Sequence, residues 1–136
     1  MTPFISIITP TYNRKDLLEK AILSVKNQDR TLTFEYEHII IDDGSTDGTK
    51  EFIQKYSNDQ EYHIIYRYQE NGGVGKARNH ALSLINKEST YTLFLDSDDE
   101  IKADLIRNCL EKWSSLDKNK EYESILGFYF LCEDEA

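Results

Sequence analysis

Two carboxylates, Asp96 and Asp98, lie two residues apart directly after the apolar run YTLFL. Two oxygen ligands at the end of a strand can converge on one Mg²⁺ or Mn²⁺ ion, and so few carboxylates leave coordination positions for the phosphates of a substrate. The acidic start of a helix explains the pattern equally well, because Asp98, Asp99 and Glu100 precede a predicted helix and negative side chains are favourable near a helix N-terminus. The pattern therefore predicts either a divalent-metal site or a helix start.

Polar residues also follow the other apolar runs. Asp42 and Asp43 come after the run EHIII and precede Gly44. These residues fit a turn that also caps a helix. They fit equally well a binding site in which a carboxylate accepts hydrogen bonds from a nucleobase or from ribose hydroxyls. Tyr12 follows the first apolar run and offers a ring that can stack on a flat ligand, although tyrosine at such a place is more often a packing residue.

The segment from Asn71 to Arg78 combines three glycines with two cations, Lys76 and Arg78. Glycines allow the backbone to approach a ligand closely, and cations at the start of a helix oppose its dipole unless an anion binds there. The spacing matches neither the dinucleotide-binding fingerprint nor a P-loop. The segment therefore indicates an anion site, with a solvated pair of surface cations as the alternative.

Alternating apolar runs and amphipathic segments must position these residues. We expect strands at residues 4–9, 37–41, 62–68, 91–95 and 124–132, the first of them ending at Pro10. We expect helices at residues 13–27, after an N-cap at Asp47, at 76–86 and from Ile101 to Trp113, with a loop at 114–123. Short apolar strands between helices predict an α/β three-layer sandwich with a mostly parallel central sheet. The polar segments then meet at the carboxyl edge of the sheet, where such folds bind ligands.

The composition narrows the class of protein. The chain has 136 residues, the length of one domain, and a net charge of −9 from 25 acidic and 16 basic residues. Such an acidic surface repels a phosphate backbone, so we expect no nucleic-acid partner, although a single nucleotide can bind at a local site. Cys109 and Cys132 lack metal-ligand spacing and fit reduced thiols. The sequence shows neither a signal-peptide pattern nor an apolar run long enough to span a membrane.

Four segments occur in the order and spacing of a known family. They are SIITPTYN, IDDGSTD, the stretch from Asn71 to Asn79, and LDSDD. Together they resemble family 2 glycosyltransferases, which have the GT-A fold, and the resemblance covers nearly the whole chain. It implies a nucleotide-diphosphate sugar as donor, with uracil the expected base, and Mn²⁺ or Mg²⁺ as cofactor. The donor-binding residues that it implies are Pro10, Tyr12, Asp43, Asn71, Arg78 and Asp96, and the metal ligand that it implies is Asp98.

The resemblance also implies a role for each residue. Tyr12 would pack on uracil in a pocket with Pro10, and Asp43 would hydrogen-bond the base. Asn71 and Arg78 would lie near the base, the ribose or the pyrophosphate, and Asp96 against the ribose or the sugar. The chemistry of the residues agrees, since carboxylates repel a pyrophosphate unless a divalent cation lies between them, and that cation stabilises the charge of the leaving diphosphate.

The family usually carries its catalytic base, an Asp in a Glu-Asp-type motif, and its acceptor-binding half further downstream. Glu133 and Asp134 imitate that motif only 35 residues after Asp98, and we interpret them as a polar strand end. We therefore expect residues 1–136 to be one donor-binding domain of a longer, inverting enzyme whose base lies beyond Ala136.

The resemblance extends to partners and location. The expected acceptor is a glycan or a lipid-linked glycan of the cell envelope. The expected location is the cytoplasm, with peripheral binding at the inner face of the membrane as the further option. The apolar run at residues 125–132 would leave a surface open, which predicts self-association into a homo-oligomer.

Other classes of protein stay open at this point. A nucleotide-binding module without transfer activity fits the same strand-end residues. A receiver-like signalling domain also has an acidic pocket, but it needs carboxylates after the first strand, where this chain has Thr9, Pro10 and Thr11. A phosphatase of the Asp-x-Asp type fails for the same reason, because its motif normally ends the first strand.

Overall fold

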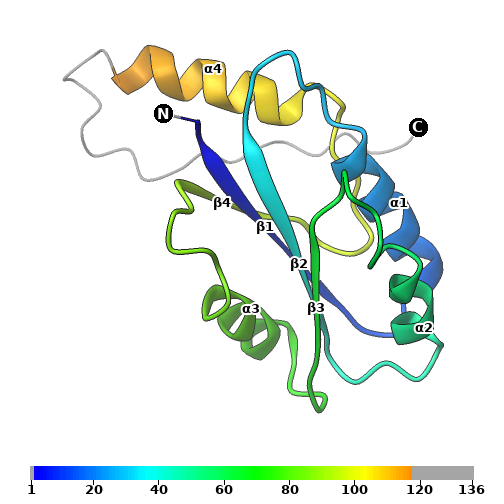
Figure 1. Ribbon diagram of the computed structural model, residues 1–136. Helices are drawn as coiled ribbons and strands as arrows, with labels where there is room; N and C mark the ends of the chain where they lie inside the picture. The colour runs from blue at the N-terminus through cyan, green and yellow to red at the C-terminus, as the bar shows by residue number, and fades with distance from the viewer. Residues whose placement is uncertain (1, 118–136) are drawn as a thin grey trace, which may run out of the picture.

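Strands and helices alternate along the chain in the computed structural model, which describes residues 2–117 (Figure 1). The elements are β1 (Phe4–Thr11), α1 (Lys15–Lys26), β2 (Glu35–Asp42), α2 (Thr49–Gln54), β3 (Ile64–Tyr68), α3 (Val74–Leu82), β4 (Tyr91–Phe94) and α4 (Leu105–Asp117). The four strands form one sheet in the order β3-β2-β1-β4, and every neighbouring pair is parallel. The predicted parallel α/β architecture is confirmed.

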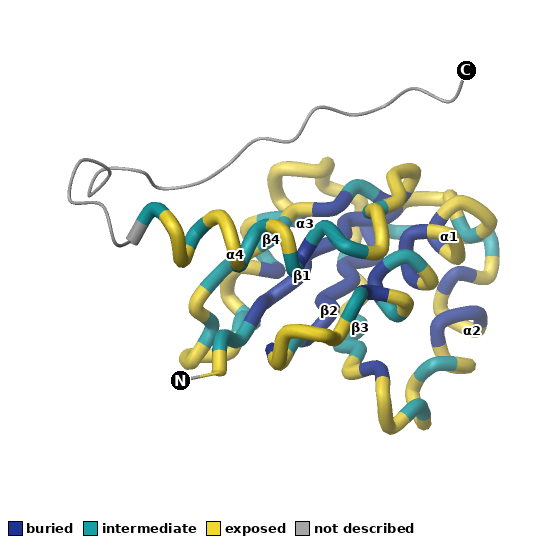
Figure 2. The backbone as a smooth tube through the Cα atoms, turned by 90° about the horizontal axis from the view of Figure 1, so that it is seen from above, coloured by how far each residue is buried: buried dark blue, intermediate teal, exposed yellow. Residues whose placement is uncertain are grey.

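The alternation of side chains along the strands separates two apolar layers. Ile7 and Ile40 belong to the larger core, which also contains Ile22 of α1, residues of α2, and Ile106 of α4. Ile8 faces the other way and packs in a smaller core. That core contains Ile39, Ile41, Ala77 and Ala81. Helix α3 therefore covers one face of the sheet, and the other helices cover the opposite face (Figure 1). Figure 2 shows that burial is concentrated in the two central strands, β1 and β2.

Strand β1 does not end at Pro10, contrary to the prediction from the sequence. Pro10 lies within the strand and pairs in register with Ile41 of β2. The carbonyl of Ile8 accepts the N–H of Leu95, so Ile8 and, two residues on, Pro10 direct their backbone groups toward the β4 side. Pairing with β4 stops at Ile8. The N–H that proline lacks would therefore face a side with no partner strand, and the central strand tolerates it.

Several element boundaries differ from the predictions. Residues 114–117 are the last turn of α4 and not part of a loop, and the hydroxyl of Ser115 donates to the carbonyl of Lys112. Ile101 precedes α4, and its N–H donates to Ser24 Oγ. Gly48, at φ +83°, occupies the N-cap position of α2 that was predicted for Asp47.

Some predictions fall outside the described residues. These are the strand at 124–132, the thiol of Cys132, the interpretation of Glu133 and Asp134, and the self-association that was drawn from residues 125–132. Within residues 2–117, Cys109 is a free thiol. No helix of this part of the chain has both the length and the apolar character that crossing a bilayer requires.

A buried histidine bridges the sheet to the segment that precedes β3. His38 is fully buried in β2, with Nε2 2.7 Å from Thr9 Oγ1 and Nδ1 2.5 Å from the hydroxyl of Tyr62. Burial disfavours the imidazolium form and lowers the pKa of His38 to about 3. Both ring nitrogens therefore have partners in the neutral state, and the histidine is part of the core.

Candidate functional site

The polar segments that follow β1 and β2 are joined to each other at the carboxyl edge of the sheet. Asn13 has a left-handed backbone, at φ 49°, and its N–H donates to Ser45 Oγ at 2.8 Å. Its side-chain Oδ1 accepts the N–H of Thr46, also at 2.8 Å. The N–H of Lys15 donates to Asp47 Oδ2 at 3.0 Å. These three contacts hold the start of α1 against the segment that leads into α2.

Asp43 joins the segment after β2 to the glycine-rich segment after β3. Its Oδ1 accepts Gln69 Nε2 at 2.7 Å and the N–H of Gly72 at 2.9 Å, and its Oδ2 accepts the N–H of Gly73 at 2.8 Å. Asn71 Nδ2 donates to the backbone carbonyl of Asp43 at 3.0 Å. Burial acts to raise the pKa of Asp43, but these hydrogen bonds outweigh it and hold the pKa below its ordinary value. The carboxylate is therefore charged at neutral pH and organises the loop.

Arg78 joins helix α3 to the end of β4. Its Nη2 lies 2.7 Å from Asp96 Oδ1, and its guanidinium carbon lies 5.8 Å from the centre of the Phe94 ring. Its Nε is buried and has no hydrogen-bond partner within residues 2–117. A guanidinium at this place adds local positive charge to an acidic protein, next to a carboxylate at a strand end.

Asp98 is paired with Arg14 across the same edge. Arg14 Nη1 lies 2.6 Å from Asp98 Oδ2, and the two side chains are 50% and 45% exposed. The alternative of a helix start does not hold. The acidic run, which we define as Asp96 to Glu100, ends before α4 begins at Leu105. Asp98 is therefore an exposed carboxylate on the rim of the sheet and lies outside the first turn of the helix.

The acidic run holds more negative charge than the two arginines offset. Desolvation and the negative charges of Asp98 and Asp96 raise the pKa of the neighbouring Asp99. Within residues 2–117, no group of three or more His, Cys, Asp or Glu side chains is arranged to bind a metal ion by itself. Mg²⁺ and Mn²⁺ do not need such a group, because one or two carboxylates together with the phosphates of a substrate can hold them. The residues present fit a metal ion that is shared with a bound diphosphate.

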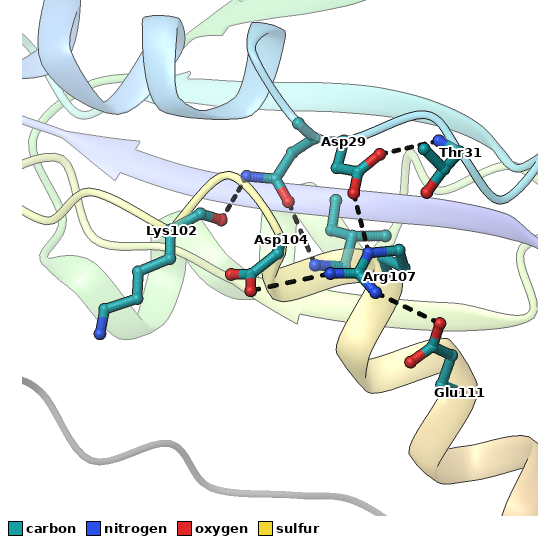
Figure 3. Close-up of polar contacts among 8 residues, drawn as sticks. Asp29, Thr31, Lys102, Asp104, Arg107 and Glu111 are labelled. Atoms are coloured by element: carbon teal, nitrogen blue, oxygen red, sulfur yellow. Dashed lines mark hydrogen bonds and ion pairs between the residues drawn. The ribbon is translucent and has the colours of Figure 1, made fainter.

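The segment after the acidic run is held by Gln28 and Asp29, which follow α1. Gln28 Nε2 donates to the carbonyl of Lys102 at 2.8 Å, and Gln28 Oε1 accepts the N–H of Ile106 at 3.1 Å. Arg107 Nε lies 2.8 Å from Asp29 Oδ2, and Figure 3 shows this guanidinium among several carboxylates. The acidic run is thus anchored on both flanks, since the N–H of Leu95 bonds to β1.

The predicted residues meet in pairs. Asn71 contacts Asp43, and Arg78 contacts Asp96. Pro10 is buried at the end of β1, and the next tyrosine, Tyr12, is 49% exposed. The role of each of these residues in donor binding stays a prediction.

The sequence reasoning missed two residues of the site. Arg14 pairs with the predicted metal ligand, and Gln69 contacts Asp43. Arg14 carried a usable signal, because it is a cation at the start of a helix on this edge, which is the argument that selected Arg78. Gln69 gave no such signal, since a single glutamine after a strand is unremarkable.

Relatives of this chain are glycosyltransferases of bacteria. It is 42% identical over 110 residues to TuaG of Bacillus subtilis, a protein named as a glycosyltransferase of teichuronic acid biosynthesis. It is 34% identical over 125 residues to a Campylobacter jejuni enzyme named GalNAc(5)-diNAcBac-PP-undecaprenol beta-1,3-glucosyltransferase. The matched regions are 80% and 92% of this chain but only 41% and 38% of the two relatives. The chain thus spans well under half the length of either protein.

A solved structure and a family description agree with these relatives. The crystal structure of Staphylococcus aureus TarS in complex with UDP-GlcNAc superimposes with a TM-score of 0.69 at 32% sequence identity. That match covers 87% of this chain and 32% of the TarS chain. The family described as Glycosyl transferase family 2 matches residues 6–120, which is most of the sequence. The chain therefore belongs to glycosyl transferase family 2 and has its GT-A fold.

Proposed function

We propose that this chain forms the donor-binding part of a metal-dependent, inverting glycosyltransferase that moves a sugar from a UDP-sugar to an acceptor hydroxyl. The observation that carries the proposal is the carboxyl edge of the sheet, where Asp43 holds the glycine-rich segment, Arg78 pairs with Asp96, and Asp98 pairs with Arg14. The related TarS structure holds UDP-GlcNAc and supports uracil as the base of the donor.

Each side chain has a role in this proposal. Tyr12 supplies an exposed ring for the uracil, beside Pro10. Asp43 fixes the glycine loop and accepts a hydrogen bond from the base, and Arg78 offers its guanidinium to the ribose or to the diphosphate. Asp96 faces the ribose or the sugar, and Asp98 holds Mn²⁺ or Mg²⁺. The metal ion, when bound, stabilises the negative charge of the leaving diphosphate.

The acceptor in this proposal is a glycan or a lipid-linked glycan of the cell envelope. The names of two relatives support it, because one refers to teichuronic acid and the other to an undecaprenol-linked oligosaccharide. A lipid-linked acceptor would bring the reaction to the inner face of the membrane. The base that deprotonates the acceptor hydroxyl is not assigned to any residue of this chain.

Thermal unfolding with UDP, with and without Mn²⁺, tests the donor site. A ligand at 100 times its dissociation constant stabilises the folded state by about 2.7 kcal/mol, which raises the melting temperature of a domain of this size by several degrees. We expect a rise that needs both UDP and Mn²⁺ and is lost in Asp98→Asn. GDP, TDP and AMP are the controls. Equal shifts with AMP, or no shift with any nucleotide, would contradict the proposal.

A further inference from the structure

The side chain of Arg14 neither packs in the core nor caps a helix. Arg14 lies at the N-cap position of α1, in a non-helical conformation, and its side chain makes no capping hydrogen bond there. The flanking backbone is fixed by the contacts of Asn13 with Ser45 and of Lys15 with Asp47. The side chain is therefore aimed across the edge of the sheet, where its guanidinium reaches Asp98.

The pair between Arg14 and Asp98 occupies the carboxylate that the proposed function gives to the metal ion. The guanidinium binds Asp98 Oδ2 at 2.6 Å, so a metal ion on this carboxylate would compete with Arg14 for its negative charge. Both side chains are about half exposed, and pairs of this kind in solvent are weak. Arg78 differs, because its Nε is buried and its guanidinium lies against the Phe94 ring. Arg14 is thus the arginine of the two that can change its partner easily.

We propose that Arg14 exchanges partners during donor binding, holding Asp98 when no metal is bound and moving to the diphosphate when the metal takes Asp98. This proposal rests on the proposed function. The exchange would keep the charge of Asp98 balanced throughout, because a bound metal ion would neutralise this carboxylate when Arg14 leaves it. A released guanidinium on this rim finds phosphate oxygens within the same site, and its planar fork matches their geometry. Arg14 is then a positioning residue for the donor.

The exchange predicts two effects of opposite sign in Arg14→Gln. The affinity for Mn²⁺ without nucleotide should rise about 2- to 5-fold, because a weak competitor for Asp98 is removed. The affinity for UDP at saturating Mn²⁺ should fall about 10-fold or more, because a charge-assisted hydrogen bond is lost. A residue with a merely structural role would weaken both affinities or neither. Electron paramagnetic resonance of free Mn²⁺ measures the first affinity, and titration calorimetry measures the second.

Lys20→Gln is the matched control, since it removes one exposed positive charge from the same helix away from the edge of the sheet. The exchange is supported if Arg14→Gln changes the two affinities in opposite directions while Lys20→Gln changes neither. If the unmodified chain binds UDP with Mn²⁺ but Arg14→Gln changes the affinities in the same direction, changes only one or changes neither, the exchange is wrong and the proposed function stands. If the unmodified chain binds neither Mn²⁺ nor UDP, both proposals fail.

Discussion

Replacing Asp43 with asparagine should destabilise the fold much more than the same replacement at Asp98. The carboxylate of Asp43 accepts three hydrogen bonds, whereas Asp98 has one exposed ion pair with Arg14. In Asp43→Asn an amide NH₂ group replaces one carboxylate oxygen. This NH₂ group faces an N–H donor, and that donor then has no acceptor. That costs about 1–3 kcal/mol, and each remaining hydrogen bond weakens by about 1 kcal/mol when its acceptor loses its charge.

The expected loss in the free energy of unfolding is about 3 kcal/mol for Asp43→Asn, since the exposed Gly73 N–H can still reach water. It is about 1 kcal/mol or less for Asp98→Asn, because exposed ion pairs contribute little. Urea unfolding, followed by the fluorescence of the single tryptophan, Trp113, measures both values. At an m-value of about 2 kcal/mol per molar, the midpoint of Asp43→Asn should fall by about 1.5 M. Equal midpoints for the two variants would refute the assignment of Asp43 as the organiser of the loop.

Two further predictions concern the core and the loop. The pKa of His38 is about 3 in the folded state and about 6.5 in the unfolded state. Below pH 6.5 the imidazole therefore binds a proton in the unfolded state but not in the folded state, and the free energy of unfolding falls as the pH drops through 6.5. Between pH 7 and pH 5 the free energy of unfolding should drop by about 2 kcal/mol more in the wild type than in His38→Asn, with the exposed His63→Gln as control. A drop that His38→Asn leaves unchanged would contradict this account. Gly44→Ala should lose about 1–3 kcal/mol, because φ is +91° and a Cβ would lie 3.0 Å from the backbone nitrogen of Asn71. Gly75→Ala, where a Cβ meets nothing within 4 Å, should gain about 0.5–1 kcal/mol by thermal unfolding, and equal effects at the two glycines would refute the packing argument.

The periodicity of apolar residues predicted the architecture because it reports burial directly. Ile7 and Ile8 fall on opposite faces of β1, and each face has its own helical layer, as the sequence pattern requires. The end of β1 could not be predicted in the same way. Whether Pro10 ends a strand depends on which neighbour its backbone faces and on how far β4 extends, and both are properties of the assembled sheet.

The residues of the candidate site could be predicted, because they follow strands in the sequence. The contacts between these residues could not be predicted. Asp43 reaches Gly72 and Gly73 because Gly44 and Gly73 take positive φ values, which turn the two segments toward each other. A glycine in the sequence permits such a conformation but does not specify it. The pair between Arg14 and Asp98 joins residues 84 positions apart, so no local pattern encodes it.

A protein this acidic has to offset negative charge at the edge of the sheet if it is to accept the diphosphate of the proposed donor. The chain carries a net charge of −9, yet Arg14 and Arg78 each pair with one carboxylate of the Asp96–Asp98 pair. These two pairs cancel the charge of the motif without adding an excess of positive charge. Attraction for a diphosphate then has to come from a further cation, or from an arginine that leaves its carboxylate. In our proposal a divalent ion on Asp98 would supply the first and, by displacing Arg14, the second, so one binding event would shift the charge of the edge in favour of an anion.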